Sequence, residues 1–182
     1  MTELSLHILD IIENSVSAGA KNIKLSINED LTQDLYSIEI TDNGKGMNKE
    51  EIQNSADPFF TSRTTRKVGL GLPLFKLAAE QSNGSLNIES QPGKGTSVKA
   101  VFELSHIDRQ PLGDIAGVIC MIIKSYPGID LIYEHKTNYG KYKIDTVEIR
   151  KIIEDMPLND IKIIRFLKEM IIENLVDIKI SA

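Results

Sequence analysis

The sequence predicts an α/β protein, and three observations lead to this fold class. Short segments alternate polar and apolar side chains, which is typical of strands with one buried face. Between them lie segments whose apolar residues recur every three or four positions, as on one face of an amphipathic helix. Of the 182 residues, 41% are hydrophobic and 26% are charged, which is ordinary for a globular chain with a full core.

The first 104 residues are expected to contain three helices and four strands. Leu4, Ile8, Ile11, Ile12 and Val16 form the apolar stripe of an opening helix. A pair of side chains with capping-box spacing, Asn48 and Glu51, predicts the start of a short helix. The expected order is helix, strand, strand, short helix, loop, helix, strand and strand, over residues 2–18, 22–27, 35–40, 48 onward, 57–69, 70–81, 85–90 and 97–104.

The pattern changes after residue 104. A linker, HIDRQPLGD, precedes a helix over 115–123, strands near 129–133 and 142–144, and a helix that Asp145 caps and that ends before Pro157. The last helix carries on one side Ile161, Ile164, Leu167, Ile171, Leu175 and Ile178. We expect a first domain over 1–104 and a small accessory domain over 105–182, which serves as a packing layer or a dimer surface.

Composition excludes some classes of partner. The net charge of −5 argues against general affinity for nucleic acid or anionic membrane. The single cysteine, Cys120, cannot form an internal disulfide, which favours a reducing cytoplasm. We see no signal peptide, and no uncharged apolar run approaches the roughly 18 residues that span a membrane.

The opening helix carries short polar side chains opposite its apolar stripe. His7, Asp10, Asn14 and Ser17 follow at spacings of three, four and three residues. Asp10 and Asn14 stand one turn apart, so their oxygens can reach the same metal-bound phosphate or water. A solvated helix face is the alternative interpretation.

The segment DNGKGM follows a strand and precedes a helix, so it shapes the edge of a pocket rather than closing a hairpin. The carboxylate of Asp42 can accept a hydrogen bond from an exocyclic amine. Gly44 and Gly46 lack side chains, which allows a flat ring such as adenine to lie close to the backbone. Turns of this composition are common, so the segment alone is a weak indication.

Two further glycine-rich segments follow. In VGLGL, Gly69 and Gly71 free backbone N–H groups at a helix N-terminus, where the partial positive charge favours phosphate. Arg63, Arg66 and Lys67 precede it and can neutralise phosphate charge. The last segment, GKGTS, lies in the final hairpin and by itself indicates only a turn.

Together, in this order and at this spacing, the four segments resemble the GHKL superfamily. That superfamily includes gyrase B, heat-shock chaperone ATPases, sensor histidine kinases and MutL-type repair proteins. The resemblance covers residues 1–104; NSVSAGA is similar to the repair-ATPase motif and DPFFTSRTTRKVGLGL to the histidine-kinase lid. It implies a Bergerat fold, a two-layer α/β sandwich with a mixed sheet and three helices, to which 105–182 adds a small α/β appendage.

The resemblance also implies the ligand and the residues that hold it. ATP is expected with Mg²⁺, which Asn14 binds through its amide oxygen, while Asp42 binds the adenine amine and Thr96 lies near the base. Gly69, Leu70 and Gly71 are expected to offer N–H groups to the phosphates. The whole implied nucleotide-binding set is Asn14, Asp42, Gly44, Gly46, Met47, Arg63, Lys67, Gly69, Leu70, Gly71, Leu72 and Thr96.

The sequence departs from the superfamily in two respects. Asp10 stands where the ATPase branches have a glutamate general base, and a carboxylate arm that is shorter by one bond (~1.5 Å) can cost roughly a hundredfold in rate. Asp10 is therefore a possible general base. The three histidines, His7, His106 and His135, are expected to be structural or solvated, so a phosphoacceptor would lie on another chain.

Three functions follow from these features. The chain is a stand-alone ATP-dependent phosphotransferase or regulator that acts on a partner protein, an ATP-hydrolysing clamp of the gyrase or MutL type, or a non-enzymatic ATP/ADP sensor. HIDRQPLGD and YEH are weakly similar to ATP-binding proteins associated with hydrogenases of anaerobic bacteria, which suggests a redox enzyme subunit as the partner. A homodimer is also possible.

Overall fold

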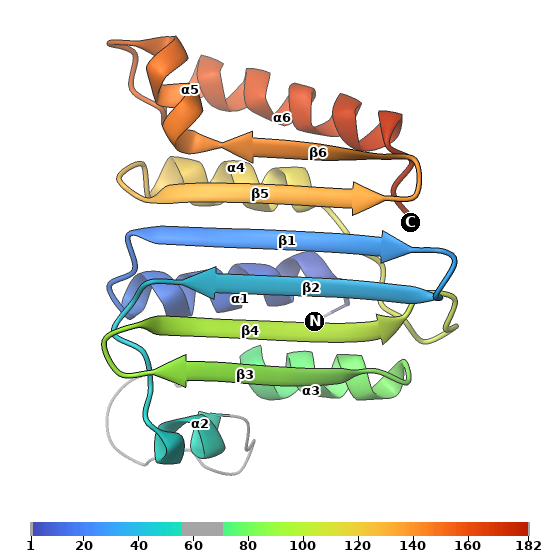
Figure 1. The fold of residues 1–182 in the computed structure, drawn as a ribbon. Helices are drawn as coiled ribbons and strands as arrows, with labels where there is room; N and C mark the ends of the chain where they lie inside the picture. The colour runs from blue at the N-terminus through green and yellow to red at the C-terminus, as the bar shows by residue number, and fades with distance from the viewer. Residues whose placement is uncertain (1, 56–70, 182) are drawn as a thin grey trace.

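A computed structural model of the chain describes residues 2–55 and 71–181. These residues form an α/β fold in which a mixed six-stranded sheet carries its main helices on one face (Figure 1). The strand order is β3-β4-β2-β1-β5-β6. Neighbouring strands run antiparallel except for β1 and β5, which are parallel. The predicted fold class is confirmed.

The first part of the chain contains the three predicted helices and four strands. Apart from the loop at 57–69, which lies outside the described residues, the observed elements follow the predicted order and differ from it by a few residues at their ends. Their bounds are α1 Leu4–Ser17, β1 Asn22–Asp30, β2 Leu35–Asp42, α2 Lys49–Ser55, α3 Gly71–Gln81, β3 Ser85–Gln91 and β4 Gly95–Glu103. The capping box forms as expected, because the N–H of Asn48 donates to Glu51 Oε2 at 2.7 Å and the N–H of Glu51 donates to Asn48 Oδ1 at 2.9 Å.

The second part extends the same sheet. Its elements are α4 Ile115–Ser125, β5 Asp130–Thr137, β6 Gly140–Asp145, α5 Thr146–Ile153 and α6 Ile161–Asp177. Strand β5 pairs with β1 from Asn22 opposite Asp130 to Asn28 opposite Lys136. Helices α4 and α6 pack against each other, and α4 also contacts α1. Strands from both parts of the chain therefore lie side by side, and one hydrophobic core runs beneath them.

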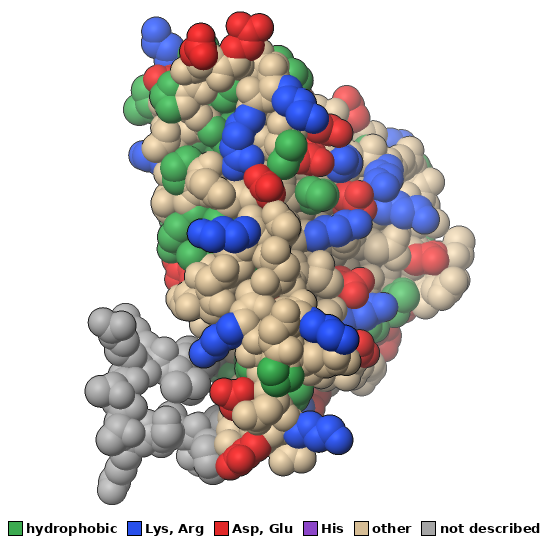
Figure 2. Space-filling view, turned by 60° about the vertical axis from the view of Figure 1, so that its left-hand side comes forward, with side chains coloured by type: hydrophobic (Ala, Val, Ile, Leu, Met, Phe, Trp, Pro, Cys, Tyr) green, Lys and Arg blue, Asp and Glu red, His purple; other side chains and the backbone are tan. Residues whose placement is uncertain are grey.

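Alternation along the strands explains which face is buried. In β1 the buried side chains are Ile23, Leu25 and Ile27, and in β2 they are Tyr36, Ile38 and Ile40. These residues face the helix layer, and the intervening polar residues face away from it. Acidic and basic side chains are interspersed over the side of the molecule that Figure 2 shows.

Two of the six apolar residues that line one side of the predicted last helix are not fully buried, because Ile164 is half-buried and Ile161 is exposed. Leu167, Ile171, Leu175 and Ile178 of the last helix are buried as expected, whereas Ile161 is 67% exposed. Ile161 is the first residue of α6, and no described element covers its side of the helix there. Within residues 2–55 and 71–181, none of the helices is both long and apolar enough to cross a membrane.

Candidate functional site

Helix α1 places Asp10 and Asn14 one turn apart, as the sequence predicts. Asn14 is exposed, and its side-chain amide makes no hydrogen bond to the described part of the chain. Asp10 is half-buried beside the start of α3, where a Cβ added to Gly71 would lie 2.8 Å from Oδ2 of Asp10. The first turn of α3 therefore approaches Asp10 closely because residue 71 has no side chain.

His7 does not belong to this polar stripe, which corrects the interpretation of the opening helix. Its side chain is 1% exposed and stacks on Phe75 of α3, with ring centroids 5.2 Å apart. Nε2 lies 3.0 Å from Oε1 of Gln110. Burial lowers the pKa of His7 more than the hydrogen bond to Gln110 raises it, so the ring is held neutral. His7 therefore connects α1 to α3 through Phe75 and to the linker through Gln110.

Asp42 ends β2 with its carboxylate fixed by two donors. The hydroxyl of Ser15 donates to Oδ2 at 2.7 Å, and the N–H of Gly44 donates to Oδ1 at 2.8 Å. Each carboxylate oxygen keeps a further lone pair with which it can accept a hydrogen bond from a ligand. Asp42 is therefore held in one orientation and still has accepting capacity.

Sequence reasoning missed Ser15. It lies on the buried side of α1, four residues after Ile11 and three after Ile12, and is 4% exposed. A hydroxyl inside an apolar stripe needs a buried partner, which is the signal that could have found it. Its partners are Asp42 and the carbonyl oxygen of Ile11, at 3.2 Å.

Further hydrogen bonds fix the loop after Asp42. Oδ1 of Asn43 accepts from the N–H groups of Lys21 and Asn22 at 2.8 and 2.9 Å. The N–H of Lys45 donates to the carbonyl of Ala18 at 3.0 Å. These bonds tie the loop to the end of α1 and to the start of β1, so the carboxylate of Asp42 sits on a rigid support.

The β3–β4 hairpin closes the site on its other side. Gly46 has φ +67°, and a Cβ there would lie 2.0 Å from the carbonyl oxygen of Gln91. Gly95 has φ +100°, and a Cβ there would lie 1.9 Å from the carbonyl oxygen of Asp42. No side chain fits at either place. Both glycines thus allow the hairpin and the loop after β2 to pack backbone against backbone.

Thr96 lies directly opposite Asp42 in the β2–β4 register, so both side chains point to the helix face. Its hydroxyl is 2.9 Å from that of Ser90, and Ser90 Oγ also accepts from the N–H of Met47 at 2.8 Å. Ser90 was not predicted, because a serine in a strand gives no sequence signal of its own. The structure therefore brings Asp10, Asn14, Asp42 and Thr96 to one end of the sheet.

Some predicted residues cannot be placed. Arg63, Arg66, Lys67, Gly69 and Leu70 lie outside the described residues. Leu72, in the first turn of α3, is half-buried and packs on the hydrophobic core.

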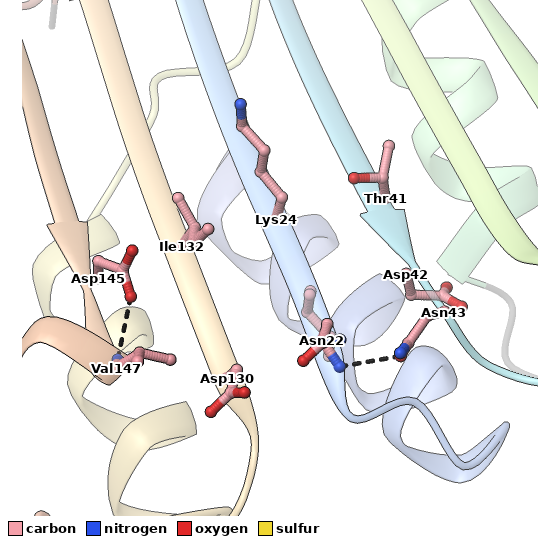
Figure 3. A pocket seen from close by; sticks show the side chains of 10 residues that line it. Asn22, Lys24, Thr41, Asp42, Asn43, Asp130, Ile132, Asp145 and Val147 are labelled. Carbon is pink, nitrogen blue, oxygen red and sulfur yellow. Dashed lines mark hydrogen bonds between the residues drawn. The ribbon is translucent and has the colours of Figure 1, made fainter. Parts of the chain in front are cut away.

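A groove of about 490 Å³ opens on the face of the sheet that is opposite to the helices and to the predicted site (Figure 3). Lys24, Thr41 and Ile132 line it from strands β1, β2 and β5, together with Asp130 and Asp145. Thr41 alternates with Asp42, so the two side chains leave the strand on opposite faces. The groove lies mainly behind the predicted site; it borders on Asp42 and Asn43 at the end of β2, but not on Asp10, Asn14 or Thr96.

The donor set can be tested against the expected ligands. An amide oxygen without a protein partner, at Asn14, suits a hard cation such as Mg²⁺, which is usually held by few protein oxygens together with phosphates and water. Within the described ranges, no three or more His, Cys, Asp and Glu side chains gather as a metal site. A cation held mainly by a bound nucleotide fits these residues.

Comparisons with known proteins bear on the family and the fold of the chain. Residues 2–106 match the family described as histidine kinase-, DNA gyrase B-, and HSP90-like ATPase. A non-motile and phage-resistance protein of Caulobacter vibrioides is 31% identical over 112 residues, which are 57% of this chain and 13% of that protein. Sensor histidine kinase YxdK of Bacillus subtilis is 32% identical over 104 residues, or 54% of this chain and 32% of the kinase.

The chain thus spans a third or less of the length of these two relatives. Among solved structures, the N-terminal domain of a DNA repair protein superposes with a TM-score of 0.54 at 17% identity, over 80% of this chain and 52% of that one. At this identity the likeness shows the fold alone.

Proposed function

The chain belongs to the family of histidine kinase-, DNA gyrase B- and HSP90-like ATPases, and from this premise we propose that it binds Mg²⁺-ATP and uses it to phosphorylate or regulate a partner protein. The observation that carries the proposal is the fixed carboxylate of Asp42, which Ser15 and Gly44 orient beside the end of α1. An oriented acceptor at the end of a strand, next to helix oxygens that have no hydrogen bond within the described residues, suits an adenine base with its phosphates toward the helix.

Each residue has a role in this proposal. Asp42 accepts a hydrogen bond from the exocyclic amine of adenine, in the pocket that Gly44, Gly46 and Met47 border, and Thr96 lies beside it. Asn14 holds Mg²⁺ through its amide oxygen, and the cation supplies charge neutralisation at the phosphates. The N-terminus of α3, which begins at Gly71, favours the negative charge of the phosphates.

Phosphotransfer is favoured over rapid hydrolysis by the short carboxylate of Asp10. Its side chain makes no hydrogen bond to the described part of the chain and lies next to Gly71 at the start of α3. Asp10 can orient or deprotonate an attacking group there, but its arm is shorter than that of a glutamate by one bond. Slow intrinsic hydrolysis leaves bound ATP available for a partner that carries the acceptor.

Calorimetry with ATP and ADP, with and without Mg²⁺, tests the binding. We expect saturable binding that Asp42→Asn weakens roughly 10- to 100-fold, as loss of a hydrogen bond to a charged acceptor does. Asn14→Ala should abolish the Mg²⁺ dependence while the free energy of unfolding changes by less than about 0.5 kcal/mol, since the side chain is exposed. Glu13→Ala, an exposed neighbour, is the matched control.

Absence of nucleotide binding at millimolar concentration would remove the proposal. Transfer is tested by incubating the chain with γ-labelled ATP and cell extract, where labelling of a partner should disappear in Asn14→Ala. Tight binding without any labelled protein would contradict phosphotransfer and leave regulation through the nucleotide-bound state.

The ATP-hydrolysing clamp is a second candidate, because the carboxylate of Asp10, which has no hydrogen bond within the described residues, is close to the start of α3 and so to the predicted phosphate site. Steady release of ADP by the purified chain, lost in Asp10→Asn, would favour it over phosphotransfer.

A further inference from the structure

Helix α6 presents exposed apolar side chains to solvent along one flank, beside the face that packs on the core. The helix packs on α4 and β6 through Leu167, Ile171 and Leu175. This flank carries Ile161, Ile172 and Val176, which are 67%, 45% and 69% exposed, and Phe166, which is 62% exposed, lies farther round the helix. With 100° per residue, these three side chains fall within one narrow arc. We call them the α6 stripe. In Figure 1, α6 lies at the margin of the molecule beyond β6.

Charges beside the α6 stripe are separated by sign along the helix. Lys162 and Arg165 lie in its first half, and Glu169, Glu173 and Asp177 lie in its second half. Although Arg165 and Glu169 are one turn apart, none of these five side chains forms an ion pair within the described ranges. They are therefore available to a partner.

This separation of charge opposes the helix macrodipole. The positive end of a helix is its N-terminus, where acidic side chains are stabilising and basic ones are not. Apart from the N-cap Asp160, α6 has no acidic residue in its first turn, and it has no basic residue in its last turn. In an isolated chain this arrangement is unfavourable, and a second helix of opposite direction would offset it.

The exposed side chains on this flank of α6 fall in pairs about the midpoint between Lys168 and Glu169. Ile161 and Val176 are equally distant from this point in sequence, and so are Arg165 and Ile172. A surface that is complementary to itself in this way is what a two-fold axis requires. We infer that α6 pairs with α6 of a second copy of this chain, antiparallel, about a two-fold axis that passes beside Glu169.

In this pair, Ile161 of each copy packs on Val176 of its partner. Arg165 of each copy lies beside Ile172 of the partner, between Glu169 and Glu173 of that helix, so basic halves meet acidic halves. A helix of 17 residues is only about 25 Å long, and one helix face falls short of the ~800 Å² per partner of a standard interface. The dimer should therefore be weak and depend on concentration and on salt.

Sedimentation velocity on the whole chain, from about 10 μM to about 1 mM, tests the association. Arg165→Glu should weaken the dimer at least about tenfold, because it places like charges beside each other. The double variant Arg165→Glu with Glu173→Arg should restore it. Lys99→Glu, at an exposed lysine on the open face of the sheet that has no ion pair within the described residues, gives the matched control for a change of charge.

Cysteine cross-linking tests the direction of the pair. Glu169→Cys lies next to the proposed axis and should form a disulfide-linked dimer under mild oxidation, whereas the native Cys120 is buried. In Asp177→Cys, the two cysteines would be about 25 Å apart and should not link. A chain that stays monomeric throughout this range, or that links equally well through residue 177, overturns the inference. Either result would mean that the α6 stripe is a surface for a different protein rather than for a second copy of this chain.

Discussion

Polar side chains at the two ends of the sheet differ in whether they are hydrogen-bonded within the protein. Where β2 ends and β1 begins, Asp10 and Asn14 leave their oxygens without hydrogen bonds to the described part of the chain. At the other end, Glu29 of β1 and His135 of β5 are 4% and 0% exposed, and Oε1 of Glu29 lies 2.7 Å from Nε2 of His135. Nδ1 of His135 lies 2.7 Å from the hydroxyl of Tyr133, and the N–H of Ser181 donates to Oε2 of Glu29 at 2.8 Å.

The difference separates side chains that support the fold from those that are available to a ligand. A buried polar group must be bonded within the protein, because an unsatisfied one costs about 1–3 kcal/mol. The Glu29–His135–Tyr133 network meets this requirement and joins the first and second parts of the chain. Asp10, Asn14 and Asp42 at the other end are half-buried or exposed, so solvent or a ligand can reach them.

The largest expected effect breaks the buried network. His135→Ala would leave the carboxylate of Glu29 buried with only Ser181 as its donor, and an incompletely satisfied buried group costs about 1–3 kcal/mol, or more when it is charged. Urea unfolding followed by circular dichroism measures this loss. Lys136→Ala, an exposed neighbour on β5, is the control. Nucleotide affinity at the far end of the sheet should not change in whatever fraction remains folded.

A change of less than about 1 kcal/mol in His135→Ala would show that the network contributes little, since this is the range of an ordinary hydrogen bond. The two ends of the sheet would then not differ in the way described above.

The second prediction concerns the catalytic capacity of the Asp42 end. Asp10→Glu restores the longer carboxylate arm and should raise the rate of ATP hydrolysis by up to about a hundredfold. The additional bond changes the position of the carboxylate relative to the attacking water, and a base acts efficiently only when it is aligned with that water. Steady-state ADP release measures it. Asp10→Asn should reduce hydrolysis to background; hydrolysis at the parent rate in that variant would exclude Asp10 as the base.

The third prediction sharpens the role of Ser15, which is buried yet belongs to the Asp42 end. Ser15→Ala frees the carboxylate of Asp42 to rotate and should weaken ATP binding about tenfold, equivalent to ~1.4 kcal/mol. Ser17→Ala on the exposed side of the same helix is the matched control. If calorimetry gives equal affinities for the two variants, Ser15 has a role in packing only.

The smallest expected effect is a pH dependence of stability that originates in Glu29. Burial alone would raise the pKa of this carboxyl, but hydrogen bonds from His135 and Ser181 outweigh it and hold the pKa below its ordinary value of 4.5. The unfolded chain thus takes up this proton at higher pH than the folded chain. The stabilisation is fully present above pH 4.5 and is lost as the pH falls through the pKa of the folded state.

Urea unfolding at a series of pH values from neutral to about 3.5 measures this dependence. Glu29→Gln should remove this part of the acid destabilisation, whereas Glu50→Gln, an exposed carboxylate, should not. Parallel curves for the parent chain and Glu29→Gln would contradict the prediction.

Short-range sequence patterns predicted most of the helices and strands and several residues of the candidate site. The stripe of α1, the Asn48–Glu51 capping box and the segment after β2 each depend on residues a few positions apart, so their pattern is readable in the chain. The order of glycine-rich segments likewise indicated the family. Asp10, Asn14, Asp42 and Thr96 were predicted for these reasons, and the structure brings them to one end of the sheet.

Only the tertiary structure decided which distant groups meet. Ser15 reaches Asp42 across 27 residues, and His135 reaches Glu29 across 106. His7 is buried because α3 and the linker cover it, although its place in the helix pattern suggested an open polar face. Whether β5 joins the free edge of β1 depends on the shape and burial of both partners, since hydrogen bonds between strands carry no signature in either strand alone. The sequence by itself therefore determined the elements and their family, and long-range packing determined which polar groups are bonded and which remain open.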